Sequence, residues 1–228
     1  MTATAARNWI RLARQHPSAL LLAVQLLGVL LYPAMEDTQA GRAMFGAFGI
    51  LVLSLALWVV NRSPLVNWVA WVLALPSVTL SIFAALSGRA DLVAVIHLLE
   101  GMLYLYAAFG LIAYMLRDHR VSLDELFAAG ATFTLLAWAF AYSYSVCQQW
   151  FPGSFIAAVE PDAPRTWMEL LFLSFSTLSG VGLSDIIPIR PQARALVMLE
   201  QFAGVMYIAL VVSRLIGLTV LRAPPRRE

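Results

Sequence analysis

Long apolar runs without charge divide this chain, and most of them have the length of a membrane span. They cover residues 15–35, 43–61, 63–88, 92–116 (broken only by Glu100), about 126–149 and about 195–221. A bilayer core about 30 Å thick needs roughly 20 helical residues to cross it. Charged residues make up only 12% of the chain, whereas a soluble domain carries about 25%. We therefore expect an all-α membrane protein with six transmembrane helices.

Arginine placement sets the expected orientation. If both termini lie inside, the inner side carries nine arginines and the outer side carries five. Cytoplasmic loops are the ones enriched in basic residues. We therefore expect a multi-pass protein of the plasma (inner) membrane with both termini cytoplasmic. A signal peptide is the competing interpretation of Arg14 and the run after it, but no A-x-A cleavage site follows.

The sequence does not have the residue patterns of an enzyme, a metal site or a nucleic-acid-binding protein. The net charge is only +2, and the arginines stand between the apolar runs instead of forming one basic face. The lone Cys147 excludes an intrachain disulfide, and the three histidines show no H-E-x-x-H spacing. A membrane-embedded hydrolase would need a paired nucleophile and base. We expect no enzymatic activity, no cofactor and no nucleic-acid partner.

One apolar segment, residues 166–178, is too short to cross the bilayer, because at about 1.5 Å per residue its helix reaches less than about 20 Å. Gly180 and Gly182 follow it in the stretch T-L-S-G-V-G-L-S-D. Alternate glycines permit dihedrals that turn successive carbonyls the same way. Non-helical backbone survives at membrane depth only where protein buries it or water wets it. We expect a re-entrant helix and a carbonyl-lined loop, with a tight turn between two helices as the alternative.

This stretch resembles the pore loop of the potassium channel superfamily, whose pattern is T-x-T-T-V-G-Y-G-D with a proline three residues later. The chain matches the pattern without a gap at Thr177, Val181, Gly182, Asp185 and Pro188, with Ser179 in place of a threonine. The last apolar run is similar to the inner helix of small prokaryotic channels, and Gly204 falls at the family's hinge position. The resemblance covers roughly residues 124–221.

The resemblance implies a homotetramer in the lipid bilayer, in which rings of backbone carbonyls replace the hydration shell of a monovalent cation, first of all potassium. It assigns the ion-binding filter to Ser179, Gly180, Val181, Gly182 and Leu183. It assigns the support of the filter to Thr177, Ser184 and Asp185, and the hinge to Gly204. The spacing of Val205, Ile208 and Val212 suits either the lining of an apolar cavity or ordinary helix packing.

Three departures from the family pattern bear on selectivity. Gly180 replaces the last filter threonine, so one ring of hydroxyl ligands is missing. Leu183 replaces the tyrosine that braces the loop, and Ser184 replaces the outer glycine. We expect a passive cation channel whose potassium selectivity is weakened. The alternative is a membrane sensor or scaffold whose degenerate pore loop does not conduct.

Four regions are expected along the chain. Residues 1–116 form a four-helix transmembrane region, which is not voltage-sensing because its fourth span lacks repeated arginines. Residues 117–127 form either an interfacial linker helix, with a capping box at Ser122 and Glu125, or a solvated loop. Residues 128–221 form the pore domain, with outer helix, pore helix, filter and inner helix, and residues 222–228 form a short cytoplasmic tail.

Two acids lie within the spans. Glu100, with His97 one helical turn before it, is either half of a pH-sensitive pair or a neutral acid hydrogen-bonded between helices. Glu200 poses the same choice in the last helix, and we interpret it as a structural contact behind the filter.

Overall fold

A computed structural model describes residues 16–36, 48–49, 51–52, 54–56, 58, 67–117 and 122–221. In chain order its elements are α2 (Pro17–Glu36), α4 (Asn67–Ser87), the 3-10 turn η1 (Ala90–Leu92), α5 (Val93–Met115), α6 (Leu123–Trp150), β1 (Phe155–Ile156), α7 (Trp167–Leu178), β2 (Ile187–Pro188), α8 (Pro191–Tyr207), the π-helical turn η2 (Ile208–Val212) and α9 (Ser213–Leu221). The described chain is therefore mostly helical, as the sequence predicts.

Among the described residues, three helices are long and apolar enough to cross a membrane. They are Val93–Met115, Leu123–Trp150 and Pro191–Leu218, the last of which combines α8, η2 and part of α9. The predicted first span overlaps α2 at all but its last residue, and the predicted third span contains α4; the two helices have 20 and 21 residues. Most of the predicted second span, residues 43–61, lies outside the described residues. The total of six spans therefore stays a prediction.

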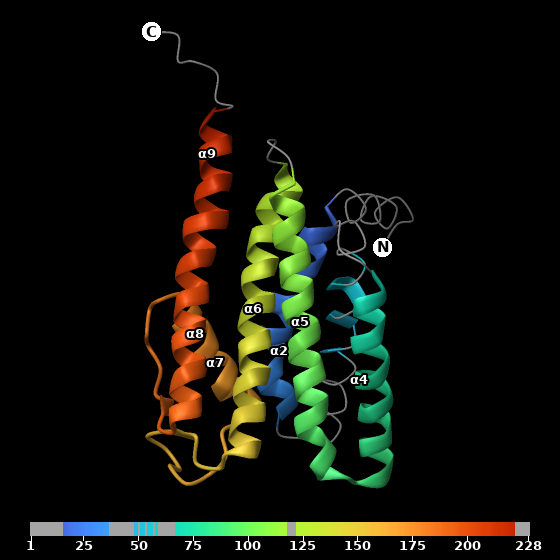
Figure 1. Ribbon diagram of the computed structural model, residues 1–228, viewed down its shortest axis with the longest axis vertical. Helices are drawn as coiled ribbons and strands as arrows, with labels where there is room; N and C mark the ends of the chain where they lie inside the picture. Colours follow the sequence, from blue (N-terminus) through green and yellow to red (C-terminus); the bar gives the residue numbers. More distant parts are fainter. Residues whose placement is uncertain are drawn as a thin grey trace.

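Helix α6 lies inside the described bundle, with α2, α5, α7 and α8 packed against it (Figure 1). Among its buried side chains, Trp138 packs edge to face against Tyr104 of α5 and against Trp167 of α7, with ring centroids 5.4 Å apart in both pairs. Of the apolar window of α6, 61% is buried, against 28% for Pro191–Leu218. The last helix thus leaves a long apolar face uncovered in a single chain.

Hydrogen bonds show which helix ends lie together. Near the start of α2, the backbone N and the hydroxyl of Ser18 each donate to the Asp124 carboxylate over 3.0 Å. The Tyr114 hydroxyl, near the end of α5, donates to the same carboxylate over 3.3 Å. At the opposite end, β1 directly after α6 pairs antiparallel with β2 directly before α8. Residues 157–186 therefore leave and return at one end of the bundle (Figure 1).

The capping box predicted at Ser122 is confirmed. The Ser122 hydroxyl accepts from the Glu125 backbone N over 3.2 Å, and the Glu125 carboxylate accepts from the Ser122 backbone N over 2.9 Å. The helix that begins there continues to Trp150 without a proline to interrupt it. Residues 123–127 are therefore the first turns of α6, and the prediction of a separate linker helix over them is wrong. Residues 118–121 lie outside the described residues.

Candidate functional site

The candidate filter follows α7 directly and is not helical. Helix α7 ends at Leu178, as predicted, and residues 181–186 have no regular secondary structure. Gly180 and Gly182 have φ values of +73° and +71°. A residue with a Cβ pays roughly 1–2 kcal/mol in this left-handed region, whereas glycine does not. The alternation of glycines in the sequence thus corresponds to an alternation of backbone conformation.

Backbone hydrogen bonds fix the start of this loop to the last turn of α7. The Gly180 N donates to the Thr177 carbonyl, and the Gly182 N donates to the Ser176 carbonyl, both over 3.1 Å. Further along, the Ser184 hydroxyl accepts from the Ile186 backbone N over 3.1 Å. The loop geometry therefore depends on where α7 ends.

Exposure divides the predicted filter residues into two groups. Thr177 is buried, and Ser184 is half-buried. The exposed residues are Ser179, Gly180, Val181, Gly182, Leu183 and Asp185. Val181 and Leu183 are 71% and 72% exposed, so two branched apolar side chains at the candidate filter have little covering within one chain.

Helices α7 and α8 meet through two matched pairs of residues. The Ser174 hydroxyl of α7 bonds the Glu200 carboxyl of α8. One turn further along both helices, the Leu178 carbonyl lies against Gly204, where a Cβ would be only 2.0 Å from that oxygen. Because both positions advance by four residues, α7 runs parallel to α8 from the β1–β2 end toward the middle of the bundle. Its C-terminal carbonyls, the negative end of its dipole, therefore lie at the start of the candidate filter loop.

Glu200 joins three helices. The Tyr144 hydroxyl of α6 donates to one oxygen of its carboxyl, and Ser174 of α7 contacts the other oxygen. The Ser174 hydroxyl is also 2.7 Å from the Ala137 carbonyl of α6. All three side chains, Glu200, Tyr144 and Ser174, are fully buried. Glu200 thus has hydrogen-bond contacts with two other helices, and its predicted structural role behind the filter stays a prediction. Its partners lie too far apart in sequence to be predicted from spacing.

Gly204 lies inside a continuous α-helix, because α8 extends from Pro191 to Tyr207. The helix departs from α-helical hydrogen bonding at the π-helical turn η2, just beyond Gly204. Val205 and Ile208 are 64% and 47% exposed, and Val212 is half-buried. The cavity-lining and hinge assignments stay predictions, while the close approach of Gly204 to Leu178 is a contact that sequence reasoning missed.

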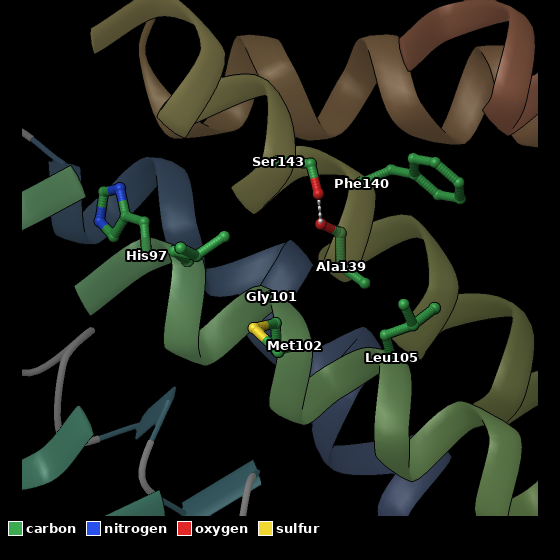
Figure 2. A pocket seen from close by; sticks show the side chains of 8 residues that line it. His97, Gly101, Met102, Leu105, Ala139, Phe140 and Ser143 are labelled. Atoms are coloured by element: carbon green, nitrogen blue, oxygen red, sulfur yellow. Dashed lines mark hydrogen bonds between the residues drawn. The ribbon is translucent and has the colours of Figure 1, made fainter. Parts of the chain in front are cut away.

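His97 and Glu100 have different partners. The His97 Nδ1 is 2.8 Å from the Ser145 hydroxyl and 3.3 Å from the Gln149 side-chain nitrogen, both on α6. Glu100 instead interacts with the Tyr142 hydroxyl. Figure 2 shows His97 at the edge of a cavity of about 100 Å³ between α5 and α6. No hydrogen bond joins these two described residues, His97 and Glu100, and their role as a pH-sensitive pair stays a prediction.

The loop before α7 is held by Arg165, which sequence reasoning did not single out. Its side chain is 2% exposed and donates to the Val159, Glu160 and Ala163 carbonyls and to the Glu169 carboxylate. Glu169 also completes a capping box with Thr166 at the start of α7. The spacing T-x-x-E at residues 166–169 is the signal that could have revealed this cap.

Residues 130–220 match the family described as ion channel, a pore family of two-transmembrane potassium channels. The match begins within α6, includes α7, the candidate filter and α8, and ends in α9. No curated protein and no solved structure shows significant similarity to the chain. The match supports a channel-like function in a membrane. The match to residues 130–220 thus supports a potassium-channel-like pore domain in this part of the chain.

Proposed function

We propose that this chain forms a homotetrameric channel that conducts monovalent cations, first of all potassium, passively down their electrochemical gradient. The observation that carries the proposal is the non-helical segment after α7, in which Gly180 and Gly182 both have positive φ. Such backbone can present carbonyl oxygens in place of a cation's water shell. The proposed ion-binding residues are Ser179, Gly180, Val181, Gly182 and Leu183, supported by Thr177, Ser184 and Asp185.

The exposure of the candidate filter supports several copies around one axis. Backbone without internal hydrogen bonds is costly in lipid, so protein or water must surround it. In one chain, Val181 and Leu183 are more than two-thirds exposed, and the last helix is mostly uncovered. Neighbouring copies would bury these side chains and close a ring of carbonyls. We infer four copies from the family to which the pore domain belongs.

The remaining helices are consistent with six spans. At about 1.5 Å per residue, the 20 residues of α2 and the 21 of α4 each extend about 30 Å, which is the thickness of a bilayer core. The start of α2 lies beside the start of α6 through Ser18 and Asp124. The Tyr207 hydroxyl of α8 bonds the Ala129 carbonyl near that same end of α6. We therefore propose that both chain ends lie on one side of an inner membrane, the cytoplasmic side.

We propose that this channel selects potassium over sodium less strongly than channels with the usual filter pattern do. Gly180 has no hydroxyl to complete an inner ion site, and Leu183 offers no phenol to brace the loop. The carbonyls of residues 180–183 remain, so conduction does not depend on the missing groups. Reversal potentials with potassium on one side and sodium on the other measure this preference directly.

Flux into liposomes tests the proposal. We expect Gly182→Ala to abolish potassium flux, because a Cβ at φ +71° forces the loop out of its conformation. Gly88→Ala is the matched control, because Gly88 also has positive φ (+67°) and open space around it but lies outside the pore domain. The solubilised assembly should have the mass of four 25.1 kDa chains in both variants. Wild-type protein without flux under every ionic condition would instead favour a non-conducting sensor or scaffold.

A further inference from the structure

Within the part of the chain that the structure describes, Glu200 is a fully buried acid without a basic partner. The ion pairs found among the described residues are Arg89 with Asp91 and Arg165 with Glu169, both elsewhere. On α6 the titratable group that faces Glu200 is Tyr144, which has Cys147 near it. On α7 the groups near it are hydroxyls, chiefly that of Ser174. A buried carboxylate without a cation is strongly disfavoured. Hydrogen bonds must therefore stabilise the Glu200 side chain in its buried position.

Counting protons in this cluster identifies its protonation state. The Ser174 hydroxyl has one proton to donate, yet two oxygens lie within hydrogen-bonding distance, the Ala137 carbonyl and Glu200 Oε1. A carbonyl cannot donate, and neither can an ionised carboxylate. With Glu200 ionised, one of the two oxygen contacts would therefore have no proton. With Glu200 protonated, its Oε1–H donates to Ser174, Ser174 donates to Ala137, and Tyr144 donates to Oε2.

We propose that Glu200 is held as an uncharged carboxylic acid and acts as a positioning residue that fixes the pore helix, and hence the ion selectivity of the filter. The proposal rests on the channel function proposed above. Glu200 is connected to the residues next to the filter through two side chains, Ser174 and Tyr144. Ser174 lies one turn before Leu178, the last residue of α7. The Tyr144 hydroxyl also interacts with the Thr177 side chain, the first residue of the filter signature.

The chemistry of the cluster predicts which substitutions are tolerated. Glutamine reproduces the neutral acid, because its amide NH₂ can donate to Ser174 while its carbonyl accepts from Tyr144. Leucine fills a similar volume but leaves the Tyr144 hydroxyl without its acceptor. Ser174→Ala keeps the acid and removes the hydroxyl between it and Ala137.

Infrared spectroscopy of the full-length protein in liposomes tests the protonation state without requiring conduction. We expect one component of the carboxylic acid C=O absorption near neutral pH to be lost in Glu200→Gln, beside any component from Glu100. It should persist in Glu160→Gln, since Glu160 is an exposed acid of the loop before α7. Thermal stability of wild type should fall relative to that of Glu200→Gln as the pH rises through the neutral range, because the acid is protonated when folded and ionises on unfolding. Loss of a carboxylate band instead, or stabilities of the two proteins that run parallel across the neutral pH range, would overturn the assignment.

Reversal potentials test the positioning role. Glu200→Gln should keep the wild-type ratio of potassium to sodium permeability, whereas Glu200→Leu should lower it roughly tenfold, about 1.4 kcal/mol. Ser174→Ala should give the same loss and serves where Glu200→Leu does not assemble. An unchanged ratio in conducting Glu200→Leu and Ser174→Ala channels would overturn the role. Wild-type protein without flux would overturn the channel function, while the infrared band would still report on the acid.

Discussion

Replacing Gly204 by alanine tests the contact between the inner helix and the pore helix. An alanine Cβ would lie 2.0 Å from the Leu178 carbonyl oxygen, 2.9 Å from its carbon and 3.1 Å from its Cα. Real Cβ contacts essentially never fall under 3.0 Å, so the backbone of Leu178 would have to move by at least about 1 Å, the difference between 3.0 and 2.0 Å. No side-chain rotation can relieve this clash, because every atom involved is backbone.

The magnitude follows from two opposing effects. Alanine inside a helix gains up to about 1 kcal/mol over glycine, while overpacking a well-packed site costs about 1–3 kcal/mol and occasionally more. For Gly204→Ala we expect a net loss, because the displaced atoms adjoin the filter. Gly217→Ala, in α9 with nothing within 4 Å of the added Cβ, should keep only the gain.

Thermal unfolding of the reconstituted protein and reversal potentials measure the two consequences. We expect Gly204→Ala to unfold at a lower temperature and to discriminate less between potassium and sodium, and Gly217→Ala to match or exceed wild type in both. A hinge that acts only in gating would change the open probability and leave selectivity intact. If Gly204→Ala kept both wild-type stability and selectivity, the reasoning from the Leu178 contact would be refuted.

Two further predictions concern the ends of helices. Ser122→Ala removes the capping box of α6 and should cost about 1 kcal/mol of stability, measured by thermal unfolding. The control is Ser87→Ala, which removes a hydroxyl that bonds within its own helix. A loss in Ser122→Ala no larger than in Ser87→Ala would contradict the prediction. Arg165→Lys replaces a guanidinium that donates to several backbone carbonyls, so amide hydrogen exchange of residues 157–166 should become faster. Arg89→Lys changes an exposed ion pair and should leave exchange in its own loop unchanged.

The exposed pair before α5 illustrates how little a surface contact contributes. Arg89 lowers the pKa of Asp91 mainly through their hydrogen bond, so the contribution of the pair is present above the unfolded pKa of Asp91 and is lost as the pH falls through the folded value. Because the two side chains are 54% and 58% exposed, solvent screens the pair. We therefore expect the buried hydrogen bonds near α7 to contribute more to stability than this exposed ion pair does.

Features that depend on neighbouring residues could be predicted from the sequence. The cap at Ser122, the end of α7 at Leu178 and the glycines at positions 180 and 182 each follow from residues a few positions apart. The separate linker helix was wrongly predicted because mixed charge at residues 117–125 suggested a boundary, although no proline follows to end the helix. The partners of His97 and Glu200 come from other helices, and only packing determines those.

The residues that contact α8 at the base of the proposed filter and those on its exposed side are held in place by different contacts. Beneath it, Ser174 meets Glu200 and Leu178 meets Gly204, all within one chain. On the exposed side, Val181 and Leu183 have little covering within that chain, so their positions in an assembly depend on other copies. The departures at Leu183 and Ser184 lie in the outer part of the loop, beyond the contacts with α8. We therefore expect Glu200→Leu and Gly204→Ala to disturb ion selectivity more than Leu183→Tyr improves it.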